Sequence, residues 1–267
     1  MDLFFFRLST PVLAVSLVAL VGGAAAVGTV VGRRLRGRPE PNHQPVGAVQ
    51  GALLGLIGLV LAFGLTMAVG RYQDRRSIVV EEANAIGTTY LRAQLLAEPA
   101  RTTSLGLLRR YADVAVDMAD QVPDNHEFDA DQTRMDGLQR ALWRQAGDAV
   151  RTDPTGTAPR LYVESLNDMI DAHTDRVTSL RNRVPITVVV FQIVGSAVAV
   201  GMLALYVALL GRGLVTSLIA AAVVILILFI SLDLDRPHRG LITVPDSPLV
   251  SARAAMDDPP AASGPSR

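Results

Sequence analysis

The 267-residue chain contains no cysteine, which excludes disulfide bonds, thiolate zinc sites and cysteine nucleophiles. It also contains no lysine, and all 25 of its basic residues are arginine. We attribute this mainly to coding bias, although arginine also binds carboxylates and phosphates with a better-matched geometry than lysine. The 25 acidic residues balance the arginines. A net charge of zero gives no electrostatic support for nucleic-acid binding, so we expect no nucleic-acid partner.

Apolar sequence is what the chain has in abundance, since 50% of its residues are hydrophobic. Four uncharged runs, at about 11–31, 47–70, 186–210 and 214–232, are long enough to cross a bilayer as helices. No segment shows the alternation that is typical of strands. We therefore predict an all-α integral membrane protein with four transmembrane helices.

The predicted domains follow from these runs. Residues 1–70 hold the first two spans, 71–184 form a helical extramembrane bundle inserted between spans 2 and 3, and 185–233 hold the last two spans. Residues 234–267 form a polar tail, rich in Pro, Ala, Ser and Asp, that we expect to be largely disordered. A cleaved secretory signal is the alternative for the first run. Its length and the arginines that follow it, Arg33, Arg34 and Arg36, favour a retained span.

A single long helix is predicted from Val46 to about Leu96, because this stretch contains no proline and passes from an apolar to a polar half. Its apolar half is roughly 35 Å long at about 1.5 Å per residue, enough to span with some tilt. Glycines recur in this half at three- and four-residue spacing, which allows close approach of another helix. That helix belongs either to the same chain or to a second copy; the glycines are Gly47, Gly51, Gly55 and Gly58.

The bundle is predicted to contain three further helices, at 101–120, 131–150 and 160–184, separated by proline-containing breaks. Apolar residues at helical spacing mark their inward faces. In the second helix these are Met135, Leu138, Leu142 and Trp143.

Two polar stripes run along facing helices of this bundle. One consists of Glu81, Asn84, Thr88 and Arg92, and the other includes Asn167 and Asp171. They could form a buried hydrogen-bond network, a ligand pocket or the wall of a water-filled vestibule, and we favour the network or the vestibule. No histidine or carboxylate spacing matches a metal motif, and no catalytic constellation or phosphate-binding loop is present. We therefore expect no metal, no cofactor and no enzymatic activity.

Residues 59–72, Leu-Val-Leu-Ala-Phe-Gly-Leu-Thr-Met-Ala-Val-Gly-Arg-Tyr, resemble the F-V-L-G-F-Y-V-T…R-W stretch on the second helix of bestrophins. The block from Arg71 to Arg92, with Glu82 to Thr88 at its centre, looks more specifically like the bacterial bestrophin-like domain family. The pattern Leu232 to Gly240 after the last span is similar to that family as well. The resemblance covers most of residues 10–245.

The resemblance implies a pentameric anion channel whose second helix lines the pore. Carried over to this chain, the pore-lining positions are Gly55, Leu59 and Phe63, and the same i+4 row continues to Met67. Apolar rings of this kind gate by dewetting. The alternative is that these side chains face lipid or a neighbouring span. The arginines that follow would make the mouth of the pore electropositive and concentrate small anions; they are Arg71, Arg75 and Arg76.

An acidic cluster that binds calcium follows the last span in animal bestrophins. This chain has only Asp233 and Asp235 there, beside Arg236. Calcium requires six to eight oxygen ligands, so pairing of these carboxylates with arginines at the membrane boundary is favoured over a calcium site.

The leading functional hypothesis is a bestrophin-like, multi-pass cell-membrane protein that forms a homo-oligomeric anion channel in contact with lipid. The alternative is a non-conducting membrane scaffold or sensor whose helical insert binds a partner; a membrane enzyme ranks third. More arginines near span ends lie on the side of the insert and termini than on the other side. We therefore expect the bundle and both termini to be cytoplasmic.

Overall fold

The computed structural model describes residues 9–36, 44–119, 121, 126–182, 184–211, 214–236 and 240–258, with the side chains of 44–46, 181 and 214 excepted. Some positions that entered the sequence argument lie outside these ranges, among them Pro237 to Arg239 of the pattern after the last span. The described residues form helices and no strands. The helices are α2 (Thr10–Leu35), α3 (Gln44–Ala93), α4 (Ala100–Asp117), α5 (His126–Thr152), α6 (Thr157–Arg181), α7 (Ile186–Leu209), α8 (Leu214–Leu234) and α9 (Ser247–Ala254).

The chain divides into two compact units, and each is described separately. Unit 1 comprises Met1–Tyr72 and Arg183–Thr243, and unit 2 comprises Gln73–Asn182 and Val244–Arg267. The long helix α3 contributes residues to both. Its 50 residues form one continuous helix, as the absence of proline after Pro45 predicts.

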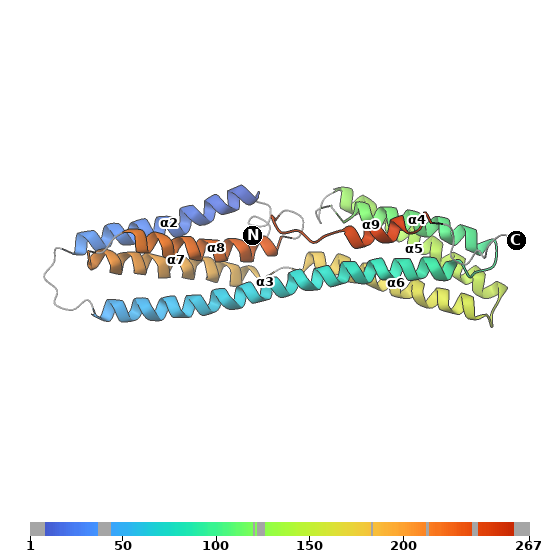
Figure 1. Ribbon diagram of the computed structural model, residues 1–267, viewed down its shortest axis with the longest axis horizontal. Helices are drawn as coiled ribbons and strands as arrows, with labels where there is room; N and C mark the ends of the chain where they lie inside the picture. The colour runs from blue at the N-terminus through green and yellow to red at the C-terminus, as the bar shows by residue number, and fades with distance from the viewer. Residues whose placement is uncertain are drawn as a thin grey trace. The chain divides into compact units, whose positions relative to one another are not determined.

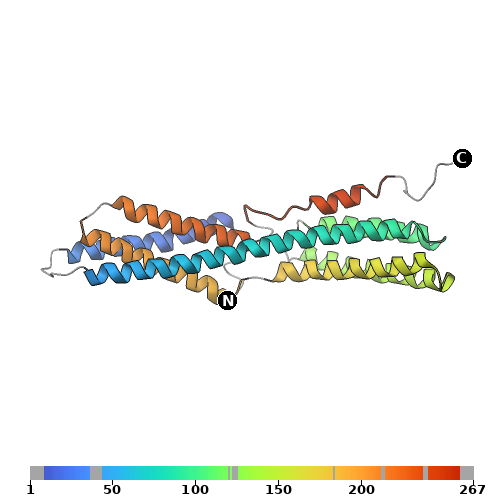
Figure 2. The same cartoon turned by 60° about the horizontal axis from the view of Figure 1, so that its bottom comes forward.

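Unit 1 contains α2, α7, α8 and the first half of α3. Within the described residues, four helices are long and apolar enough to cross a membrane, and each overlaps one of the four predicted runs. The helices α2, α7 and α8 pack side by side (Figures 1 and 2). Of the 18 consecutive residues of α7 with the highest hydropathy, 44% are buried, against 17% in the corresponding stretches of α2 and α3. The helix α7 is therefore the central helix of this unit.

The closest helix contact in unit 1 joins α2 to α7 through glycines. A Cβ on Gly28 would overlap the carbonyl oxygen of Gly201, and a Cβ on Gly32 would lie 2.5 Å from that of Leu205. Only glycine allows two backbones to approach so closely, and small residues four apart are typical of such contacts in membranes. Further along α2, buried Leu13 and Leu17 belong to the core of the unit.

Unit 2 is built around α4, α5 and α6 together with the second half of α3. Its core consists of large side chains that are almost fully buried, and among the largest are Tyr111, Tyr162, Phe128, Met135 and Leu142. The three helices occupy approximately the predicted ranges, and the predicted inward residues Met135 and Leu142 are buried. The prediction for Trp143 was wrong: its side chain is 48% exposed.

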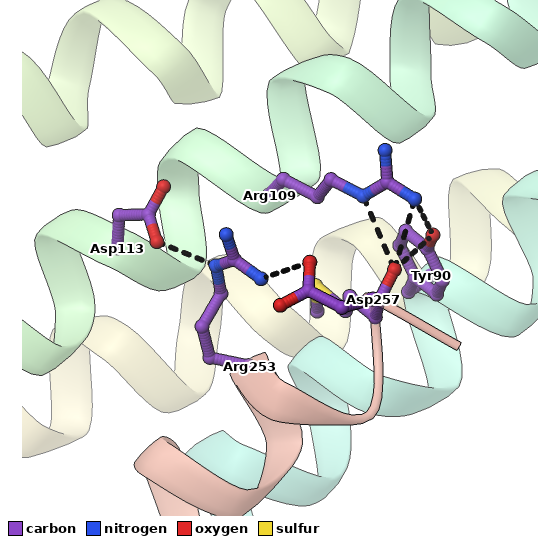
Figure 3. A network of polar contacts seen from close by, with 6 residues as sticks. Tyr90, Arg109, Asp113, Arg253 and Asp257 are labelled. Atoms are coloured by element: carbon purple, nitrogen blue, oxygen red, sulfur yellow. Dashed lines mark hydrogen bonds and ion pairs between the residues drawn. The ribbon is translucent and has the colours of Figure 1, made fainter.

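The tail also differs from the prediction of disorder. Residues Ser247–Ala254 form α9, which packs on α4 in unit 2, and Leu249 and Met256 are buried at 1% exposure each. The backbone carbonyl of Met256 accepts hydrogen bonds from the Tyr90 hydroxyl at 2.9 Å and from two nitrogens of Arg109 at 2.9 and 3.2 Å (Figure 3). Specific docking contacts therefore hold this short helix.

A second group of contacts ties α9 to α4 in the same region. The guanidinium of Arg253 donates hydrogen bonds to Asp113 on α4 and to Asp257 just beyond α9 (Figure 3). These two carboxylates, Asp257 first, raise the pKa of Arg253 above its ordinary value. The composition of the tail resembles that of disordered segments, but within its described part Ser247–Ala254 form a helix that these contacts hold to unit 2.

Candidate functional site

The predicted pore-lining row lies on the outward face of α3 in unit 1. Leu59, Phe63 and Met67 are 56%, 62% and 45% exposed, and a Cβ on Gly55 would meet nothing within 4 Å. On the other side of the helix, Ile57 and Leu61 are buried in the core of the unit. One subunit therefore leaves the predicted row uncovered. Such a row can meet lipid, a second copy or the lumen of a pore.

The rotation of α3 is set by its contacts with α7. The side-chain amide of Gln192 lies against α3 and donates a hydrogen bond to the carbonyl of Val60 at 3.4 Å. A Cβ on Gly64 would overlap that amide, and a Cβ on Gly195 would lie 2.5 Å from the end of Ile57. The two glycines thus accept side chains from the opposite helix, and Leu59 and Phe63 are turned outward.

The predicted glycine row of α3 does not pack within the chain. A Cβ on Gly51, Gly55 or Gly58 would meet nothing within 4 Å, whereas Gly47 lies against the ring of Tyr206. Close approach between helices of one chain takes place instead at Gly28 and Gly201. Of the two partners considered for this row, a helix of the same chain is therefore wrong for these three glycines, and a second copy stays a prediction.

Only part of the positive charge predicted for the mouth of the pore is accessible to solvent. The guanidinium of Arg75 is 3% exposed and donates to the carbonyls of Asn182, at 2.9 Å, and Ser179, at 3.5 Å. These carbonyls belong to the C-terminal end of α6, where backbone acceptors lack intrahelical partners. Arg71 is half-buried and forms an ion pair with Asp235 at 3.7 Å, while Arg76 is exposed. Arg75 therefore has a structural role in unit 2, and Arg76 is the one fully exposed member of the three.

The two aspartates after α8 are buried and used for local structure. Asp233 accepts hydrogen bonds from the backbone N–H groups of Leu241 and Ile242, at 2.8 and 3.0 Å. Asp235 accepts one from Val184 at 3.1 Å in addition to its ion pair with Arg71. Pairing with arginine, the favoured prediction, is thus observed for Asp235. For Asp233 the partners in this contact are backbone amides, which fix the turn that follows the helix.

The two polar stripes of unit 2 do not form a buried network. Glu81, Asn84 and Thr88 are exposed on α3, and the exposed pair Asn167 and Asp171 is joined by a 3.1 Å hydrogen bond within α6. Arg92 is the exception among the predicted residues, because it donates to the carbonyl of Leu161 on α6 at 2.9 Å and lies 3.9 Å from Glu164. The vestibule interpretation stays a prediction.

The buried polar cluster of unit 2 lies one position further round α3. Glu82 is fully buried, with its carboxylate 2.5 Å from Nε of Arg176 and 2.9 Å from Nδ1 of His173. Arg176 also donates to the carbonyl of Ala115 on α4 at 3.2 Å. The ring of Tyr111 contacts His173 edge-on, with centroids 6.1 Å apart. This cluster links three helices through charges in the core.

Burial and the neighbouring charge of Glu82 raise the pKa of Tyr111 above its ordinary value. A tyrosine is already neutral at physiological pH with its ordinary pKa, and this shift favours the same neutral form. Sequence reasoning missed this group because the stripe was drawn through Glu81 rather than Glu82. A signal existed, since Glu82 shares its helix face with the apolar residues Val79 and Ile86.

Comparison with known proteins complements this geometry. A family model described as the Bestrophin-like domain matches residues 15–249. The fold is similar to a crystal structure of a bacterial bestrophin homologue from Klebsiella pneumoniae that carries a tyrosine-to-alanine mutation. The TM-score is 0.69 at 11% sequence identity, and the match covers 90% of this chain and 97% of the other. No curated protein matches the sequence. At this identity the structural match establishes the fold alone.

Proposed function

This chain belongs to the Bestrophin-like domain family, and from that premise we propose that it forms a homo-oligomeric, anion-conducting channel in the cell membrane. Four apolar helices and the bestrophin-like fold support a membrane protein of this type. In this proposal α3 lines the pore through Gly55, Leu59, Phe63 and Met67. The bundle of α4, α5 and α6 lies outside the membrane.

The observation that carries the proposal is the uncovered row on α3. One face of this helix is packed against α7 through Gln192, and the opposite face presents Leu59 and Phe63 at more than half exposure. In a ring of subunits, such a face can be directed to the axis. Apolar side chains at the axis control hydration, and the positive edge of a phenylalanine ring can face an anion.

Anion flux into liposomes tests the proposal. Reconstituted protein is expected to conduct chloride or nitrate, and Phe63→Ala is expected to change the flux severalfold because it widens an apolar constriction. Phe191→Ala is the matched control, since Phe191 is a 54% exposed phenylalanine on α7. Absence of flux from a verified oligomer over a range of pH, calcium concentration and voltage would refute conduction.

A non-conducting scaffold or sensor is the second candidate, and one observation favours it. Of the three arginines proposed for the mouth, Arg75 is buried against carbonyl groups and Arg71 is paired with Asp235. The positive charge available to attract anions is therefore smaller than the sequence suggests. A scaffold predicts no flux and no effect of Phe63→Ala, and the flux experiment separates the two.

We further propose that the bundle and both termini are cytoplasmic. The absence of native cysteine makes this testable with single cysteine variants. Thr102→Cys, at an exposed position of α4, is expected to react with a membrane-impermeant maleimide only after the cells are opened. Leu210→Cys, at the exposed C-terminal end of α7, is expected to react in intact cells. The reverse pattern would invert the orientation.

A further inference from the structure

The outward face of α5 carries a tryptophan between unpaired arginines. Trp143 is 48% exposed, and Arg140 and Arg144 on the same face are exposed too. Within the described part of the chain, neither of these two guanidinium groups forms a hydrogen bond or an ion pair. The only tryptophan of the protein is thus about half exposed, although tryptophan is highly buried on average in folded proteins.

The surface around Trp143 is hollowed on two sides. One hollow is lined by Gly137, Arg140 and Arg144, the other by Gly147 and Arg144, and each has a volume of ≈ 590 Å³. Tryptophan and arginine are the residues most enriched at energetically dominant positions of protein interfaces. The residue types and the hollowed shape of this face are therefore typical of a protein-binding surface.

The outward face of α6 has the opposite charge. Its carboxylates recur at spacings of four, three and four residues, so that they share one side of the helix. All four are exposed: Glu164, Asp168, Asp171 and Asp175. Glu164 approaches Arg92 only at 3.9 Å, and Asp171 accepts a hydrogen bond from Asn167. No arginine of the described α5 pairs with this acidic row within the chain.

The two rows have the same intervals. Arg140, Arg144 and Arg151 are separated by four and then seven residues, and Asp175, Asp171 and Glu164 repeat this spacing in the reverse direction. At about 1.5 Å per residue, each row is about 16 Å long. The charges of an α5 face can therefore meet those of an antiparallel α6 face one for one.

We propose that the α5 face around Trp143 binds the acidic α6 row of a second copy of this chain. This inference rests on the oligomer of the proposed function and names the subunit contact in the helical bundle. Because the α5 face and the acidic α6 row are different surfaces of one subunit, such contacts can follow one another head-to-tail and close a ring. In a ring whose axis runs along the helices, α5 of one subunit is antiparallel to α6 of the next, as the spacing requires.

Arg140 and Arg144 are the principal cationic groups of this contact, because Arg151 is already paired with Asp148 on its own helix. Trp143 supplies the apolar centre between them. Ionic pairs of this kind select the partner and its register more than they add affinity. The contact is accordingly expected to weaken at high salt.

Charge reversal in the full-length protein tests the proposal. Arg144→Glu and Asp171→Arg are each expected to weaken association at least tenfold, measured by native mass spectrometry in mild detergent. The combined variant is expected to recover the wild-type assembly, because the reversed pair attracts again. Arg110→Glu, at an exposed position on α4, is the matched control and is expected to have no effect. Failure of the combined variant to recover would overturn the pairing of these two residues.

Cross-linking provides a second test, for which the cysteine-free chain is a suitable background. Differently tagged copies that carry Arg144→Cys and Asp171→Cys are expected to join through a short bismaleimide when they are co-expressed. Copies with Arg110→Cys and Asp171→Cys are not. If the wild-type protein is an oligomer that conducts anions but the first pair does not cross-link, the inference fails and the proposed function stands. If the first pair cross-links into a ring that conducts no anions, the inference stands and the proposed function fails. A wild-type monomer would overturn both.

Discussion

The two units achieve a stable interior by different means. In unit 1 the tightest contact brings Gly28 on α2 against Gly201 on α7, backbone against backbone. In unit 2 the interior is filled by large side chains such as Tyr111 and Phe128, and it also encloses the carboxyl group of Glu82 beside Arg176. Lipid provides no hydrophobic drive between apolar helices, so unit 1 depends on close fit. In the proposed arrangement, with the bundle outside the membrane, unit 2 can use burial of apolar surface to offset the cost of enclosing charge.

The comparison predicts that unit 2 is most vulnerable at its buried charges. Glu82→Ala removes the carboxylate and leaves the guanidinium of Arg176 in the core without its partner. We expect the free energy of unfolding to fall by about 3–5 kcal/mol. The loss would appear as a lower midpoint of thermal unfolding of the purified protein, followed by circular dichroism. Glu81→Ala, at the exposed neighbouring position, should change stability by less than about 0.5 kcal/mol. Equal effects of the two variants would contradict the buried cluster.

Unit 1 is expected to be most vulnerable at its glycine contact. Gly28→Val places a branched side chain where the carbonyl of Gly201 lies, and the backbone of α7 cannot move aside as a side chain could. A loss of about 2–3 kcal/mol is expected from overpacking, measured as a lower midpoint of thermal unfolding. Gly23→Val on the same helix is the control, because a Cβ there would meet nothing within 4 Å. If both variants unfold like the wild type, α2 and α7 are not in backbone contact.

A smaller loss of stability is expected at α9, the helix of the tail that docks on unit 2. Arg109→Ala removes two hydrogen bonds to the carbonyl of Met256 and leaves the one from Tyr90. We expect the free energy of opening of α9 to fall by about 1.5 kcal/mol. This corresponds to roughly tenfold faster hydrogen exchange across Ser247–Ala254. Arg110→Ala serves as the control, since that side chain is exposed. Unchanged exchange in the Arg109 variant would show that Leu249 and Met256 hold the helix without the polar contacts.

Much of the architecture follows from the sequence, because the relevant signals are long and redundant. Twenty or more uncharged residues predict a span whatever its neighbours are, and the absence of proline over about fifty residues predicts the continuity of α3. The helices of unit 2 follow from apolar spacing in the same way. Membership of the Bestrophin-like domain family also agrees with the resemblance of residues 59–72 and 71–92 to that family.

The finer features depend on the rotation of each helix, which the sequence determines only weakly. Glu81 and Glu82 are neighbours in the sequence, yet Glu81 is exposed and Glu82 is buried because they point to different sides of α3. From the sequence alone, either residue could belong to a polar stripe. An apolar membrane helix carries even less information, since every face is hydrophobic. The glycines of α3 and those of α2 could therefore not be distinguished by pattern alone. The docking of α9 was missed because three or four specific contacts outweigh a composition typical of disorder.

The contact between Gly28 and Gly201 has a mechanical consequence. With no side chain between them, α2 and α7 lose about a quarter to a half of the dispersion attraction between their backbones within the first ångström of separation. The pair of α2 and α7 is therefore the most closely fitted part of unit 1. The helix α3 is held to the rest of unit 1 by the amide of Gln192 and a few apolar side chains, so its contact lacks this close backbone fit.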